Sequence, residues 1–148
     1  MKFTAFLVIA LIISLLSFSA SNDLISNGDE FIHFKQVTMR FQGTDAVISM
    51  SYGLDMFSSM YISLMGAHNL EPAIDNFFWD FGDVEILELG RGNAVIFAKN
   101  VSRKNDAFYL YDSHTLNGTV DVLTMVLPDG STQGFMNANS TEPTFYDV

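Results

Sequence analysis

The chain has 148 residues, a formal net charge of −10 and no cysteine. A strongly acidic chain is repelled by phosphate groups, which argues against binding to nucleic acid and against docking on anionic lipid headgroups. The lack of thiols excludes a disulfide framework, a thiolate zinc site and an iron–sulfur cluster, so packing has to stabilise the fold.

The first 21 residues have the three parts of an export signal peptide. Lys2 gives a positive start, residues 3–16 are almost wholly apolar, and the small residues of 17–21 predict a signal-peptidase cut after Ser21 or Ser19. The alternative is an uncleaved membrane anchor, although about 16 helical residues span only ~24 Å of a ~30 Å hydrocarbon core. In either case we expect residues 22–148 to lie outside the cytoplasm, secreted or anchored to the membrane through residues 3–18 alone.

Residues 22–148 are long enough for a single globular domain with its own core. The stretch 31–41 alternates with period two and is rich in aromatic and β-branched residues, which predicts a strand. A turn at 42–45 leads to a second predicted strand at 46–52, so the two should form a hairpin.

Two helices are predicted after this hairpin. Residues 54–67 have apolar side chains at helical spacing and no charge after Asp55, so we expect this helix to be buried on more than one side. Its methionines, Met56 and Met60 among them, are interpreted as core filling rather than as copper(I) ligands. Pro72 in a first turn and Gly82 at the end delimit a second helix that begins near residue 69.

Strands return after Gly82. The segments 84–89 and 94–98 flank a glycine-rich turn and predict another hairpin, in which 94–98 is apolar on both faces and should be covered on both sides. Further strands are predicted at 107–111, 119–127 and 131–136, and a polar C-terminal tail from about residue 137. This order predicts an α+β fold with a mainly antiparallel sheet of about six to seven strands and two helices packed on one face.

The sequence contains no recognisable active-site motif, and we expect neither a cofactor nor a metal. The histidines His33, His68 and His114 are isolated from one another, and the acidic residues between 75 and 88 lack the order of a calcium-binding loop. Asp112, Ser113 and His114 are the residue types of a catalytic triad, but consecutive residues cannot adopt its geometry, so we interpret them as a polar turn.

The aromatic run at 77–81 contains the candidate binding residues. Three of its four rings fit the buried stripe of the second predicted helix, whereas Trp79 points away from that stripe. We therefore place a candidate contact site for a sugar, peptide, lipid surface or partner chain at Trp79, Phe78 and Asp80. The alternative is that Trp79 packs against a neighbouring loop.

Three Asn-x-Ser/Thr sequons lie in predicted loops and are candidate glycosylation sites, at Asn100, Asn117 and Asn139. Together these patterns favour a non-catalytic envelope or secreted domain that acts by binding or assembly with a protein or small-molecule partner outside the cytoplasm. The alternatives are a small secreted hydrolase that uses converging Asp, Glu and His residues, and a cation-binding protein.

Overall fold

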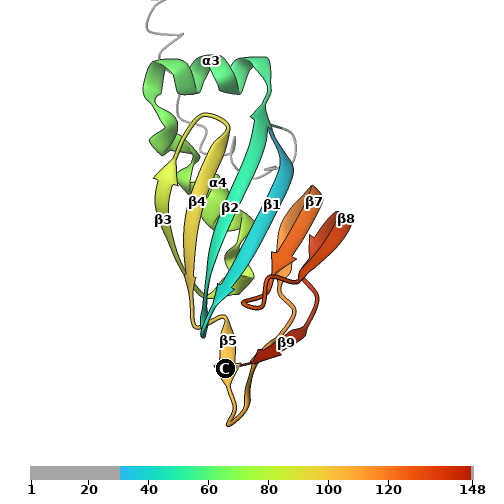
Figure 1. The fold of residues 1–148 in the computed structure, drawn as a ribbon. Coiled ribbons are helices and arrows are strands. Elements are labelled where there is room, and N and C mark those ends of the chain that lie inside the picture. Colours follow the sequence, from blue (N-terminus) through green and yellow to red (C-terminus); the bar gives the residue numbers. More distant parts are fainter. Residues whose placement is uncertain (1–30, 148) are drawn as a thin grey trace, which may run out of the picture.

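A computed structural model describes residues 31–147 as nine strands and two α-helices (Figure 1). The predicted leader at 1–21 lies outside these residues. The elements in chain order are β1 (Ile32–Gln42), β2 (Asp45–Leu54), α3 (Met56–Met65), α4 (Glu71–Phe77), β3 (Asp83–Leu89), β4 (Asn93–Lys99), β5 (Ser102–Lys104), β6 (Phe108–Tyr111), β7 (Thr115–Val126), β8 (Thr132–Ser140) and β9 (Thr144–Asp147). Two 3-10 turns, η3 (Ala67–Leu70) and η4 (Trp79–Phe81), lie before and after α4.

The strands form two sheets rather than the single one expected. Six strands pair in the order β3-β4-β2-β1-β7-β8, and three short strands pair in the order β5-β6-β9. Every pairing is antiparallel except that of β1 with β7, which is parallel. The predicted α+β class with a mainly antiparallel sheet is confirmed, as are the hairpins β1–β2 and β3–β4.

A shift in register divides β1 into two halves. Ile32 and Phe34 are buried, but the next buried side chain is Val37, because the pairing with β2 slips between Phe34 and Gln36. Bulges of this kind insert one residue and so change which side chains face the core. The simple alternation of 31–41 in the sequence therefore does not describe its burial.

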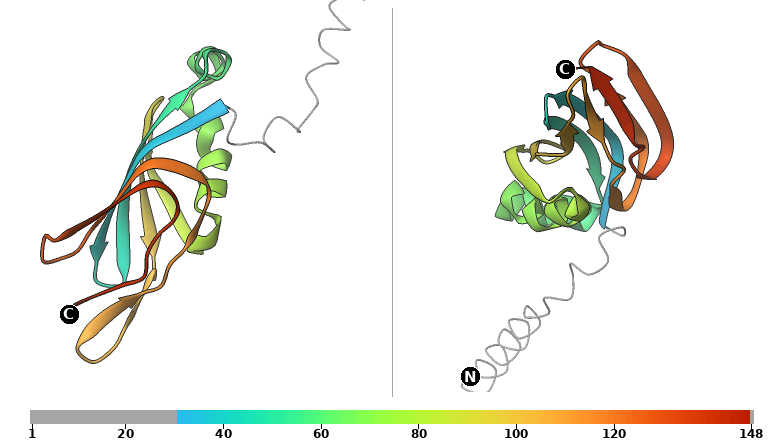
Figure 2. Two further views of the ribbon diagram at one scale, coloured as in Figure 1. Left: turned by 90° about the vertical axis from the view of Figure 1, so that its right-hand side faces the viewer. Right: turned by 90° about the horizontal axis from the view of Figure 1, so that it is seen from below.

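One face of the large sheet is covered by α4 and its flanking 3-10 turns (Figure 2). The Phe77 ring on α4 lies against the Phe34 ring of β1, with centroids 3.9 Å apart, and the two side chains are among the most deeply buried. At the far end of β1, Phe41 packs between Tyr111 of β6 and Tyr146 of β9, which joins the small sheet to the core.

The opposite face of the large sheet is only partly covered, so the expectation that 94–98 is buried on both sides is wrong. In β4, the side chains of Ala94, Ile96 and Ala98 are buried. Val95 and Phe97 point to the other face and are half-exposed.

Two other expectations are corrected. Residues 137–148 were predicted to be a polar tail, but β8 continues to Ser140 and β9 pairs with β6 through Tyr146. Thr141, Thr144 and Tyr146 are buried. A polar segment can still form a strand that directs some of its side chains into the core. The second correction concerns α3, which lies across one end of the sheet rather than on its face (Figure 1).

Candidate functional site

The α3 helix is well defined by its own ends. Asp55 precedes it, and its carboxylate accepts a hydrogen bond of 2.6 Å from the backbone N–H of Ser58. This bond stabilises the charged form and lowers the pKa of Asp55. The helix ends at Gly66, whose N–H donates to the carbonyl of Ile62 and whose φ of 94° suits glycine.

The outer surface of α3 is apolar. Two rows of side chains, each spaced four residues apart, run along the helix on its exposed side: Met56, Met60 and Leu64 form one, and Phe57, Tyr61 and Met65 form the other. Their exposed fractions lie between 53% and 84%, and together they define what we call the α3 surface. Ile62 is the one residue of the helix that is buried, at 3% exposure, and it lies on the opposite side.

The expectation that α3 is buried on more than one side is therefore wrong. An uncharged helix usually lies in a core, and no Asp, Glu, Lys, Arg or His occurs from Met56 to Met65. In this fold the helix is attached at the edge of the core through Ile62. The signal that could have indicated exposure is the placement of Ser59 and Ser63 beside the two apolar rows, but serine at a helix surface is a weak signal.

The predicted contact residues at 78–80 do not form one surface. Trp79 is 60% exposed, as predicted, whereas Phe78 is buried against Phe77 and Phe81. Asp80 is half-buried and accepts a hydrogen bond of 2.8 Å from the Thr115 backbone N–H. Among the three predicted residues, only Trp79 presents its ring to solvent.

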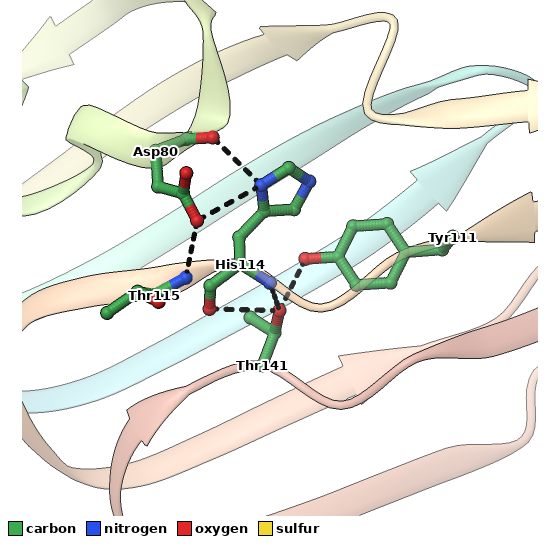
Figure 3. Close-up of polar contacts among 5 residues, drawn as sticks. All are labelled: Asp80, Tyr111, His114, Thr115 and Thr141. Atoms are coloured by element: carbon green, nitrogen blue, oxygen red, sulfur yellow. Dashed lines mark hydrogen bonds and ion pairs between the residues drawn. The ribbon is translucent and has the colours of Figure 1, made fainter.

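Asp80 belongs to a network that links three parts of the chain (Figure 3). The Nδ1 atom of His114 lies 2.8 Å from the backbone carbonyl of Asp80 and 3.7 Å from its carboxylate. The Thr141 hydroxyl accepts from the His114 backbone N–H and lies 2.7 Å from the Tyr111 hydroxyl. These bonds tie η4, the start of β7 and the chain after β8 together, so we interpret the network as structural.

The other candidate catalytic or metal-binding residues form exposed ion pairs or lie apart from one another. Asp112 forms an exposed ion pair of 2.7 Å with Arg103, so the consecutive Asp112, Ser113 and His114 do not act as a triad. His33 pairs with Asp121 and His68 with Glu71, both at 2.8 Å and both exposed. Within residues 31–147, no three His, Asp or Glu side chains are grouped closely enough to hold a metal ion.

Comparison with family models, with curated proteins and with solved structures found no match to this chain. The candidate site therefore rests on the geometry of the chain itself.

The three sequon asparagines are all exposed, at Asn100 in the turn after β4, at Asn117 within β7 and at Asn139 within β8. Two of them thus lie in strands rather than in the predicted loops.

The Tyr111–Thr141 bond gives a prediction about this structural network. Both side chains are buried, and we expect Tyr111→Phe to lower the free energy of unfolding by about 1–2 kcal/mol, because a buried hydroxyl loses a partner. Denaturant unfolding of Tyr111→Phe, Thr141→Val and the double variant gives the coupling between the two groups. Tyr109→Phe, in the same strand but half-exposed, is the control. Additive losses in the double variant would contradict the network.

Proposed function

We propose that this protein is an exported, non-catalytic domain that acts by binding, and that it binds through the α3 surface. The observation that carries the proposal is the inverted burial of α3, which directs one apolar side chain inward and six outward. The fold of residues 31–147 leaves these six side chains exposed. A large apolar side chain contributes about 1.5–3 kcal/mol when it is fully buried, so a partner that covers several of them gains substantial free energy.

The proposal moves the binding site away from Trp79. Trp79 is a single exposed ring on η4, and η4 precedes β3, whose first residue Asp83 pairs with Lys99. Trp79 therefore lies near one end of the large sheet. The α3 helix lies at the opposite end, because it begins just after Leu54, which pairs with Ile32 there. The α3 surface is larger and continuous, and it has the two-row pattern of a helix that lays one face against a partner.

The predicted signal peptide or membrane anchor is a second support for the proposal. Residues 1–21 have the pattern of a signal peptide or membrane anchor, and such a chain meets envelope or external partners rather than cytoplasmic ones. The hydrolase alternative would have to use His114 and Asp80, which is the closest His–carboxylate arrangement that is partly shielded from solvent. The His114 ring already contacts the backbone carbonyl of Asp80, and the Asp80 carboxylate accepts a hydrogen bond from the backbone N–H of Thr115, which supports a structural role.

Thiol accessibility tests whether the α3 surface is covered where the protein works. The natural chain has no cysteine, so Met60→Cys and Met136→Cys each introduce a single thiol at an exposed methionine. In envelope fractions of the producing cell, we expect a membrane-impermeant maleimide to label the thiol at position 136 at least about tenfold faster than the thiol at position 60. After solubilisation in mild detergent followed by exchange into denaturant, both thiols should label at similar rates.

Met136 is the matched control because it is an exposed methionine, 71% against 60% for Met60, on the edge strand β8. Labelling at position 136 in unbroken cells would also support an extracytoplasmic location. Equal labelling rates of the two thiols in the native envelope would show that α3 is free of any partner and would refute the proposed function.

A further inference from the structure

We infer that the partner of the α3 surface is a lipid bilayer, in which α3 lies parallel to the membrane plane with its two apolar rows among the upper acyl chains. The inference rests on the proposed function and names the occupant of the same surface. It extends the predicted membrane contact beyond residues 3–18.

The first support is the path of the chain. The backbone N–H of Asp55, the residue that caps α3, donates to the carbonyl of Phe31 at 3.2 Å. Phe31, the first described residue, therefore lies beside the start of α3, at the end of the sheet that α3 crosses (Figure 1). The apolar segment 3–18 precedes this point by a linker of about twelve residues, which reaches at most roughly 40 Å. A membrane that receives residues 3–18 is thus within reach of α3.

The second support is the geometry of α3 itself. Its ten residues span about 15 Å, half the thickness of the hydrocarbon core, and no helix among the described residues is both long and apolar enough to cross a membrane. A short helix with one apolar side suits the interface, where that side enters the lipid and the other side stays with the protein. Here the other side is held to the core by Ile62.

The third support is the residue types on the surface. Tyr61 is an amphipathic aromatic side chain, which favours the headgroup level of a bilayer, and Phe57 is an apolar ring that suits the lipid-facing side of an interfacial helix. The three methionines are flexible and adapt to an irregular, fluid partner. The helix itself, Met56–Met65, contains no Asp, Glu, Lys, Arg or His, so no charge on α3 has to be desolvated when its apolar side enters lipid. We therefore expect α3 to bind neutral lipid without help from anionic lipid, and anionic lipid to weaken binding at low salt because it repels the acidic chain.

A local probe on the full chain tests the inference, because residues 3–18 alone could hold the protein on vesicles. Met60→Cys and Met136→Cys are each labelled with an environment-sensitive fluorophore and reconstituted into phosphatidylcholine vesicles, with and without nitroxide-labelled lipid. We expect a blue shift and at least about threefold quenching by nitroxide lipid at position 60, and neither at position 136. Added Leu64→Asp should reduce the quenching at position 60, and circular dichroism should show that the fold is retained, since Leu64 is 78% exposed.

Two results would overturn the inference. One is an unshifted, unquenched probe at position 60 on vesicles that carry the protein. The other is a blue shift without quenching that grows with protein density, which would indicate a second copy. If the thiol at position 60 is protected in the native envelope but its probe stays in water on pure lipid, the proposed function stands and the bilayer inference fails. If that thiol is unprotected in the envelope, both fail.

Discussion

Replacing Phe77 with alanine is expected to lower the free energy of unfolding by about 3–5 kcal/mol, the largest effect of any single substitution considered. The Phe77 side chain is 1% exposed and lies between two other rings. Its centroid is 3.9 Å from that of Phe34 on β1 and 5.0 Å from that of Phe78. Alanine would leave a cavity at the contact between α4 and the sheet, where the surrounding rings have little room to collapse.

The consequence should be large because small domains have unfolding free energies of only about 5–15 kcal/mol. A loss of this size lowers the midpoint of thermal unfolding by on the order of 10 °C or more. Urea unfolding followed by circular dichroism gives the free energy directly. Trp79→Ala is the matched control, because Trp79 is two residues away and 60% exposed. We expect it to change the free energy by less than about 0.5 kcal/mol. Similar losses in both variants would show that α4 does not pack as described.

The domain is expected to unfold steeply above pH 10, because three buried tyrosines resist ionisation. Tyr52, Tyr111 and Tyr146 are each at most 5% exposed. Burial raises the pKa of Tyr52 to about 12, and burial also raises the pKa of Tyr111 and of Tyr146. The Tyr52 hydroxyl donates to the Gly90 carbonyl at 2.7 Å, and the Tyr146 hydroxyl donates to the Gly43 carbonyl at 2.7 Å, so both hydroxyls need their protons.

The direction of the pH effect follows from which state holds more protons. Below about pH 10 the phenols are protonated in both states, and their contribution to stability is fully present. Above that pH the unfolded chain releases these protons while the folded chain keeps them, so stability falls as pH rises towards the folded pKa values. Between its unfolded and folded pKa values each tyrosine lowers stability by at most about 1.4 kcal/mol per pH unit, and the losses of the three side chains add.

Circular dichroism and phenolate absorbance measured together across this range test the prediction. We expect the loss of secondary structure and the appearance of three of the phenolates to coincide. Tyr52→Phe should make the decline in stability less steep, because one titrating group is removed. Tyr61→Phe, on the exposed side of α3, should leave the decline unchanged. Ionisation of every tyrosine near pH 10 with the fold intact would contradict the burial of these three side chains.

Local sequence patterns were sufficient for most of the elements, although not for β9, and for part of the candidate site. The α+β class, the two hairpins and a helix with Pro72 in its first turn follow from the periodicity of apolar residues and from turn residues, which depend on neighbours a few positions away. The exposure of Trp79 follows from the same period, since Phe77, Phe78 and Phe81 occupy the buried side.

Long-range packing decided the features on which the proposed function depends. The parallel pairing of β1 with β7, the register shift after Phe34 and the pairing of β9 with β6 join segments far apart in the chain, and no local period encodes them. The same holds for α3. Its sequence determines an uncharged helix, capped by Asp55 and ended by Gly66. Whether such a helix is core or surface depends on how much apolar area the rest of the fold brings against it, and here tertiary structure covers only Ile62.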